Sequence, residues 1–319
     1  MEYNHFIDLL SDPELDMAQR VPIINRFLKK EIKLTSKNDT YTLEKYLASG
    51  SYGDVFRAVN TKGKFVAVKI TKSTDESIRE VLNYIHLSKK CEQYLVSLYE
   101  SFVNSFDNTL WLVQVQELMD GSINTIKLNH ISTCKLLVFL LNAIKCLHMR
   151  GIAHMDIRRG NIFYNEKSGF KLGDLGLACL DRNKKLLKKE KYESLKSCRF
   201  FTSYIPPKYK DYFEDMPINF DDAQTIDLWA IGVVIYRQFA SLGYYNKNIA
   251  NKLCNTTMRD DENSLRADDK VPVTIALPED SPIPKLVFEN VMGLLLYDYE
   301  PTTASKILEY LNRNIDAIL

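Results

Sequence analysis

Two acids and one amide within a short stretch of the chain could bind a metal ion and a phosphate. Asn161 lies five positions after Asp156, and Asp174 stands between an apolar run and a glycine. Carboxylate and amide oxygens carried on two loops, which a short β-hairpin would bring together, suit Mg²⁺ better than a softer metal. The stretch therefore predicts a site for Mg²⁺ and phosphate. The alternative is that these residues are ordinary surface loop acids.

The stretch resembles the catalytic loop and metal loop of the protein kinases, whose signatures are HRDLxxxN followed by DFG. This sequence has HMDIRRGN and DLG, and the two acids are 174 − 156 = 18 residues apart. The resemblance implies that Asp156 accepts the proton of a substrate hydroxyl and that Asn161 and Asp174 hold Mg²⁺. It also implies that Arg158 replaces the lysine that neutralises the transferred phosphoryl group.

A turn rich in small residues extends the resemblance upstream. Residues 48–53 read ASGSYG, and small residues let backbone N–H groups approach phosphate oxygens closely. In the family pattern GxGxxGxV the last two glycines are Gly50 and Gly53, but Ala48 replaces the first. The resemblance implies that a nucleotide contacts Leu47, Ala48, Gly50, Gly53, Val55 and Ala67.

The motif VAVK supplies the cation that a nucleotide site needs. Lys69 would contact the α and β phosphates, and it requires a carboxylate to orient it. We expect Glu80, which is 80 − 69 = 11 residues later, to be that carboxylate, with Glu76 as the alternative. Further along, the resemblance implies that backbone groups of Glu117 and Met119 bind the adenine ring.

Three regions of different periodicity must position these residues. Residues 1–40 carry apolar side chains spaced like one or two amphipathic helices broken near Pro13 and Pro22. This extension either packs on the body of the protein or docks a partner. Residues 41–118 alternate as strands do, whereas residues 119–319 are mainly helical and include the apolar helix ISTCKLLVFLLNAIKCLHMRG. With the kinase resemblance, this predicts an α+β, bilobal fold with a β-rich N-lobe and a larger helical C-lobe.

The composition restricts the partners and the location. The chain has 42 Lys and Arg against 41 Asp and Glu, so its net charge gives no signal for nucleic acid or membrane. Six cysteines without CxxC pairs favour reduced thiols in an intracellular protein. We expect a cytoplasmic rather than a nuclear location. Apolar runs such as LLVFLLNAI are too short to span a bilayer. The basic stretch that follows Leu180 is a solvated loop or a surface for acidic substrates.

Four positions depart from the family pattern: Ala48, Met155, Leu175 and Lys208. Lys208 stands where the family has a glutamate, and Glu300 stands where its arginine partner would be, which suggests an inverted ion pair. Asp227, in DLWAIG, matches the aspartate that holds the backbone of the catalytic loop.

The leading interpretation is a protein kinase that transfers the γ-phosphate of ATP to serine or threonine of a protein substrate. The cofactors would be ATP and Mg²⁺, with Mn²⁺ as the other metal. The alternative is a pseudokinase that acts as a binding protein, motivated by the four departures. A kinase for a small molecule is disfavoured by Asp227, Trp229 and the segment TSYIPP.

The loss of one arginine predicts independence from activation-loop phosphorylation. Met155 occupies the position whose guanidinium receives an activating phosphate in many kinases, so such a phosphate would lack its bidentate partner. Phosphatase-treated protein should therefore retain its phosphate-transfer rate. Treated protein without activity, restored by phosphorylation at Ser194, Ser197 or Thr202, would contradict this.

Overall fold

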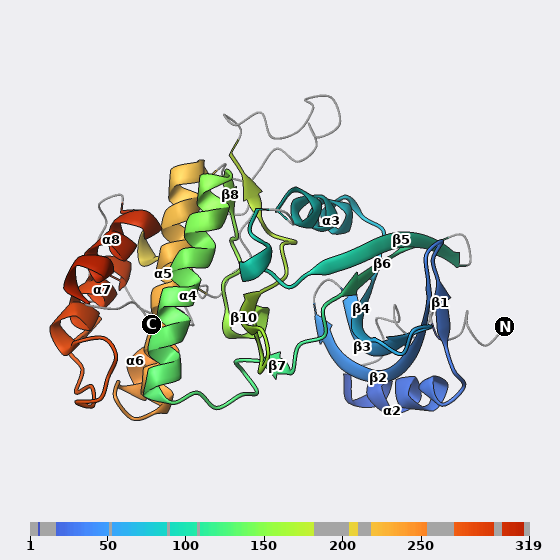
Figure 1. Cartoon of the computed structure of the whole chain (residues 1–319), viewed down its shortest axis with the longest axis horizontal. Helices are drawn as coiled ribbons and strands as arrows, with labels where there is room; N and C mark the ends of the chain where they lie inside the picture. Colours follow the sequence, from blue (N-terminus) through green and yellow to red (C-terminus); the bar gives the residue numbers. More distant parts are fainter. Residues whose placement is uncertain are drawn as a thin grey trace. The chain divides into compact units, whose positions relative to one another are not determined.

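A computed structural model shows two compact units (Figure 1). It describes residues 6, 17–50, 53–87, 90–106, 109–181, 204–209, 218–253, 271–296 and 302–315. The first unit comprises Met1–Lys89 and Val96–Met119, and the second comprises Lys90–Leu95 and Asp120–Leu319. The first unit is built on a β-sheet and the second is mainly helical. The predicted α+β fold class is confirmed.

A six-stranded antiparallel sheet forms the first unit, in the order β1-β2-β3-β4-β6-β5. Its strands are β1 (Lys33–Thr35), β2 (Thr40–Gly50), β3 (Gly53–Asn60), β4 (Phe65–Lys72), β5 (Leu98–Phe106) and β6 (Thr109–Gln116). Helix α3 (Asp75–Leu87) lies between β4 and β5 in the chain, and helix α2 (Met17–Leu28) precedes the sheet. Along β3 buried and half-buried residues alternate, as expected for a strand with two unlike faces.

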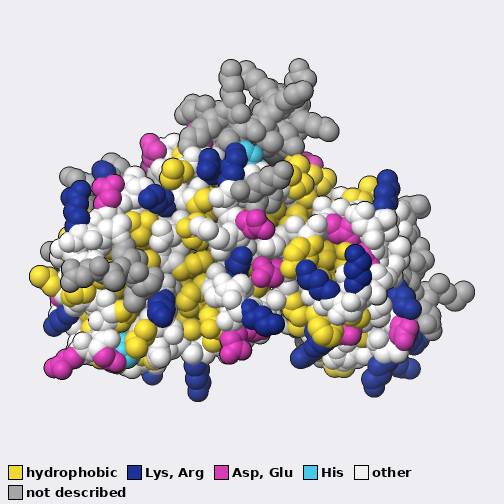
Figure 2. All heavy atoms as spheres, viewed as in Figure 1, with side chains coloured by type: hydrophobic (Ala, Val, Ile, Leu, Met, Phe, Trp, Pro, Cys, Tyr) yellow, Lys and Arg dark blue, Asp and Glu magenta, His cyan; other side chains and the backbone are white. Residues whose placement is uncertain are grey.

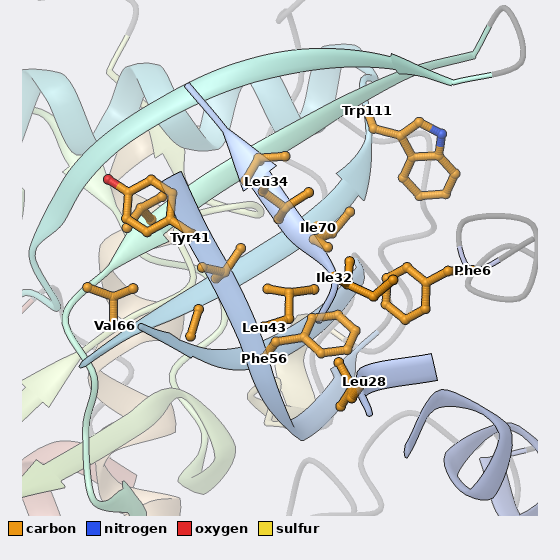
Figure 3. Close-up of a cluster of buried hydrophobic side chains, with 14 of the residues drawn as sticks. Phe6, Leu28, Ile32, Leu34, Tyr41, Leu43, Phe56, Val66, Ile70 and Trp111 are labelled. Carbon is orange, nitrogen blue, oxygen red and sulfur yellow. The ribbon is translucent and has the colours of Figure 1, made fainter. Parts of the chain in front are cut away.

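The extension before the sheet contributes to the core of the first unit. Phe6, Ile24 and Leu28 belong to one buried cluster with sheet residues such as Phe56 and Ile70 (Figure 3). These apolar side chains of the extension are thus covered by the protein's own sheet. The prediction of an extension packed on the body is confirmed for these residues, and they give no support to a docked partner.

Helix α2 runs through Pro22, so the predicted helix break at this residue is wrong. Proline removes one backbone hydrogen bond and usually interrupts a helix. Here Pro22 is exposed while Ile24 and Leu28 are buried. Burial of the apolar side of the helix offsets the lost hydrogen bond and holds the helix together.

Five helices dominate the described part of the second unit: α4 (His130–Met149), α5 (Phe220–Ser241), α6 (Lys247–Lys252), α7 (Lys285–Leu296) and α8 (Ala304–Asn314). The small sheets that accompany them are β10 (Gly169–Leu172), β9 (Ile162–Asn165) and β7 (Gly121–Ser122) together, and β11 (Cys179–Leu180) with β8 (Ile152–Ala153). Asn129 and Asn219 cap α4 and α5, since each side chain accepts a backbone N–H of the first turn.

Helix α4 is the predicted apolar helix. Its 20 residues are long and apolar enough to cross a membrane by length and composition, although the shorter apolar run LLVFLLNAI within it is not. More than half of its most apolar window is buried inside the protein, as in the core helix of a folded domain. We found no other such helix among the described residues.

The prediction that the cysteines are unpaired is wrong for Cys91, Cys146 and Cys179. Cys91 and Cys146 form a disulfide with Cα atoms 6.0 Å apart, and Cys179 is also disulfide-bonded. Cys91 precedes the 3₁₀ turn η1 (Glu92–Tyr94), and Cys146 lies in α4, so the bond joins residues 55 positions apart within the second unit. Spacing along the chain could not reveal this pair. Cys134 is a free cysteine, and burial raises the pKa of its thiol to about 11.

Several predicted features lie outside the described residues. They are the basic stretch from residue 182 to 199, Ser194, Ser197, Thr202, Glu300 and the side chain of Lys208. On the face shown in Figure 2, Lys and Arg side chains are interspersed with Asp and Glu.

The disulfide predicts a stability that depends on redox conditions. Closing a loop of this length restricts the unfolded chain, which should add up to about 4 kcal/mol to the free energy of unfolding. Cys146→Ser should therefore unfold at lower urea concentration than wild type under oxidising conditions. In dithiothreitol the difference between the two proteins should disappear. Equal midpoints without reductant would contradict the prediction.

Candidate active site

In the second unit, the turn after β8 places two other predicted site residues, Arg158 and Asn161, beside the Asp156 carboxylate. Asp156 is only 4% exposed. Asn161 Nδ2 donates to the backbone oxygen of Asp156 at 2.9 Å and to its Oδ2 at 2.6 Å. Arg158 Nε donates to the same Oδ2 at 3.1 Å. The structure thus brings together Asp156, Arg158 and Asn161 as predicted, although their roles stay predictions.

The β9–β10 hairpin carries Asp174 back to this turn. Ile162 pairs with Leu172 at the base of the hairpin, and Gly173 N–H donates to the Asn161 carbonyl at 2.9 Å. Asp174 is the next residue and has a φ of 64°, a conformation that few non-glycine residues adopt. Its Oδ1 accepts a hydrogen bond from Gly176 N–H at 3.4 Å. The two loops of the predicted metal site therefore meet at one end of a hairpin.

The environment of Asp156 raises the pKa of its carboxyl. Burial raises the pKa of this carboxyl above its ordinary value, the charges of Arg158 and His154 oppose the rise, and the charge of Asp174 adds to it. A higher pKa makes the carboxylate a better proton acceptor. This agrees with the predicted role of Asp156 toward a hydroxyl.

One buried carboxylate on α5 fixes the backbone that carries this turn. Asp227 is fully buried, and it accepts hydrogen bonds from His154 N–H at 2.7 Å and from Met155 N–H at 2.8 Å. His148 Nε2, on α4, lies 2.8 Å from the same carboxylate. Met155 has a φ of 64°, so the backbone held by Asp227 is in the strained left-handed region. The predicted contact between Asp227 and the loop backbone is confirmed.

The donor set of the second unit fits a hard divalent cation. Both hydrogens of the Asn161 amide nitrogen are directed to Asp156. This orientation leaves Asn161 Oδ1 as the atom for a cation. With the Asp174 carboxylate, it forms the all-oxygen ligand type that Mg²⁺ prefers. Asn161 and Asp174 would hold the ion, which would neutralise phosphate charge when bound.

In the first unit, the glycine turn lies between two paired strands. Gly50 pairs with Gly53 at the end of β2 and β3, and Ala48 pairs with Val55. Gly53 has a φ of 134°, and a Cβ added there would lie 2.4 Å from the Ile70 carbonyl oxygen of β4. Only glycine fits this position, because any side chain would collide with the neighbouring strand.

Lys69 and its carboxylate partner are buried together in the first unit. Lys69 Nζ donates to Glu80 at 2.9 Å to Oε1 and 2.8 Å to Oε2, and both side chains are at most 10% exposed. The expected partner Glu80 is therefore the one that the structure pairs with Lys69. Val55 is the cross-strand partner of Lys69, which places the lysine on the same face of the sheet as Val55.

A residue that the sequence did not single out completes this group. Gln114, on β6, is fully buried and donates from Nε2 to Glu80 Oε2 at 3.1 Å. Gln116 in turn donates to Gln114 Oε1 at 3.2 Å. A glutamine in the middle of the apolar run LWLVQVQ was the available signal, since a buried amide needs partners.

The remaining predicted nucleotide contacts lie in the first unit. Leu47 and Ala48 are exposed on β2, Ala67 is half-buried on β4, and Glu117 and Met119 are half-buried after β6. The Glu117 N–H donates to the Ser97 carbonyl at 2.9 Å. No described contact tests whether they bind a nucleotide.

Comparison with known proteins agrees with this arrangement. The family model described as "Protein kinase domain" matches residues 41–310. The chain belongs to the protein kinase family. Within it, the chain is 28% identical over 70% of its length to the smooth-muscle myosin light chain kinase of Gallus gallus. It is 29% identical over 45% of its length to the serine/threonine-protein kinase pakE of Dictyostelium discoideum. The matches cover only 12% and 16% of these relatives' own lengths.

Two departures from the kinase pattern are explained by packing. Met155 is 1% exposed and Leu175 is fully buried, so both side chains fill apolar positions. The prediction that Leu175 occupies an apolar slot is confirmed. Neither residue stands at one of the positions predicted to hold the metal ion or the transferred phosphate.

The contacts of Asp227 predict that Asp227→Asn destabilises the kinase domain. An amide can turn only one oxygen to the loop, so at least one buried N–H that now meets a carboxylate oxygen would face an NH₂ group. Leaving such groups unpaired should lower the free energy of unfolding by about 3 kcal/mol. Urea unfolding would measure the loss. Asp221→Asn, at an exposed position of the same helix, should have little effect, and equal losses in both variants would contradict the prediction.

Proposed function

We propose that the chain is an active protein kinase that transfers the γ-phosphate of ATP, with Mg²⁺, to serine or threonine of a protein substrate. The observation that carries the proposal is the buried Lys69–Glu80 pair. A buried ion pair costs desolvation and contributes little net stability compared with apolar side chains of similar volume. A function for the lysine accounts for a charged pair at this buried position, because an ammonium held by a carboxylate is oriented to contact nucleotide phosphates.

Each step of the reaction has a candidate residue. Asp156, buried and with a raised pKa, would orient the substrate hydroxyl and accept its proton. Arg158 would neutralise charge on the transferred group, and Asn161 and Asp174 would hold the metal. Phosphoryl transfer asks mainly for positioning and charge, so these residues suffice for the chemistry.

A cation two residues after the catalytic acid, here Arg158, resembles the serine/threonine branch. Of the two relatives reported above, pakE is named a serine/threonine-protein kinase and the other a myosin light chain kinase. The name of pakE supports the same choice. The second candidate, a pseudokinase that acts as a binding protein, is motivated by Ala48, Met155, Leu175 and Lys208. An intracellular, cytoplasmic location is also part of the proposal, although the disulfide removes the cysteine argument for it.

Phosphate transfer from labelled ATP tests the proposal. The acceptors are a general basic protein, an acidic protein and the enzyme itself, with Mg²⁺ or Mn²⁺ as the metal. We expect Asp156→Ala and Asp174→Ala each to lose about 100-fold or more in rate, and a chelator to abolish transfer. Glu166→Ala removes an exposed carboxylate from the turn between β9 and β10 and should leave the rate unchanged. Nucleotide binding without transfer in wild type would favour the pseudokinase.

A further inference from the structure

A buried carboxylate lies directly beside the glycine turn of the first unit. Asp54 follows Gly53 in β3, and its side chain is 5% exposed. Its Oδ1 accepts a hydrogen bond from the Tyr46 hydroxyl of β2 at 2.9 Å. Its Oδ2 lies 3.4 Å from Nη2 of Arg20, a residue of helix α2. The Asp54 carboxylate of β3 thus contacts one residue of β2 and one residue of the extension.

The helical spacing of α2 places Arg20 beside this carboxylate. Arg20, Ile24 and Leu28 follow one another at four-residue spacing, so they lie on one face of the helix. Ile24 and Leu28 are buried in the core of the first unit, and Phe6 packs against Phe56 with ring centroids 5.7 Å apart. This apolar packing fixes the helix, and the Arg20 side chain, only 14% exposed, is held with it.

The contact is on the side of the sheet opposite to Lys69. Side chains alternate along a strand, and Asp54 pairs with Ile70 of the core whereas Val55 pairs with Lys69. The extension therefore holds the hairpin from the face that the predicted phosphate-binding lysine does not occupy. It can fix the position of the hairpin without occupying the lysine's face.

The charge of Asp54 gives the contact a second role. A carboxylate one residue from Gly53 would repel a triphosphate bound at the glycine turn. The Arg20 guanidinium at 3.4 Å offsets that negative charge. Burial, followed by the charge of Asp54, raises the pKa of the Tyr46 hydroxyl to about 12, so Tyr46 remains a hydrogen-bond donor.

We propose that Arg20, Asp54 and Tyr46 form a clamp through which helix α2 holds the glycine hairpin in position for the phosphates of ATP. Arg20 is then a positioning residue for the nucleotide, and the extension is part of the nucleotide-binding apparatus. A hairpin that is already ordered loses less conformational freedom when it binds. The inference rests on the proposed function for its nucleotide, but the contact that it invokes can be tested separately.

Steady-state kinetics with Mg²⁺-ATP test the clamp. Arg20→Ala should raise the KM for ATP by about 3- to 10-fold with little change in kcat, because the clamp acts on binding and not on transfer. Arg20→Lys, which keeps the charge, should restore part of the affinity. Arg26→Ala is the matched control, since Arg26 is on the same helix but exposed, and it should behave as wild type.

A double-mutant cycle shows whether the residues act through one another. Asp54→Asn removes the charge that Arg20 offsets, so adding Arg20→Ala to Asp54→Asn should raise KM much less than Arg20→Ala does alone. Additive effects of the two substitutions would overturn the clamp. So would an Arg20→Ala variant that unfolds at lower temperature but keeps the KM of the Arg26→Ala control.

Hydrogen exchange separates this inference from the proposed function. The backbone amides of Ser49, Gly50, Gly53 and Asp54 should exchange faster in Arg20→Ala and in Tyr46→Phe than in Arg26→Ala, without any nucleotide. If wild type transfers no phosphate, the proposed function fails while this readout still tests the clamp. If wild type is active and exchange at these amides is the same in all variants, the clamp is overturned.

Discussion

The loop that carries the predicted catalytic residues depends on the buried carboxylate of Asp227. This carboxylate accepts two consecutive backbone N–H groups, from His154 and Met155, and it lies beside the ring of His148. Helix α5 is thereby connected to both the loop and α4. Because Met155 is held in the left-handed region, the loop needs an external partner to keep its conformation. Asp156, the next residue, takes its orientation from this backbone.

The hydrogen bonds that follow from this constraint form a short chain. The Asn161 amide donates hydrogen bonds to both the backbone and the side chain of Asp156, and the Gly173 N–H donates to the Asn161 carbonyl. The hairpin between Asn161 and Gly173 is short, so a small error in its register would displace Asp174. Backbone pairing from Ile162–Leu172 to Asn165–Gly169 fixes that register. The position of the predicted metal ligands is thus decided by strand pairing, and their chemistry by side-chain type.

In the first unit, buried polar side chains are also held in place by hydrogen bonds to one another. Lys69 and Gln114 of the sheet and Glu80 of helix α3 bind one another on one face of the sheet, and the opposite face is apolar. Each would be costly alone, since a buried charge or amide without a partner loses its hydration. Together they hold an ammonium in one place. The Asp54 contacts on the other face work in the same way, and they connect the helix before the sheet to the hairpin.

The sequence by itself determined the family, the α+β fold class and the residues that could do the chemistry. Asp156, Asn161, Asp174, Lys69 and Glu80 were identifiable as candidates because they match the protein kinase motifs in residue type and in order along the chain. Alternation and helical spacing predicted the sheet and the apolar helices, because these patterns depend on neighbours only a few residues away.

Only the tertiary structure decided the contacts between segments far apart in the chain. Cys91 and Cys146, Gln114 and Glu80, and Arg20 and Asp54 are pairs separated by tens of residues, so no local pattern reveals them. The continuity of α2 through Pro22 has the same origin, since burial of Ile24 and Leu28 outweighs one lost hydrogen bond. Local chemistry selects the candidates for a site, and packing decides which of them meet.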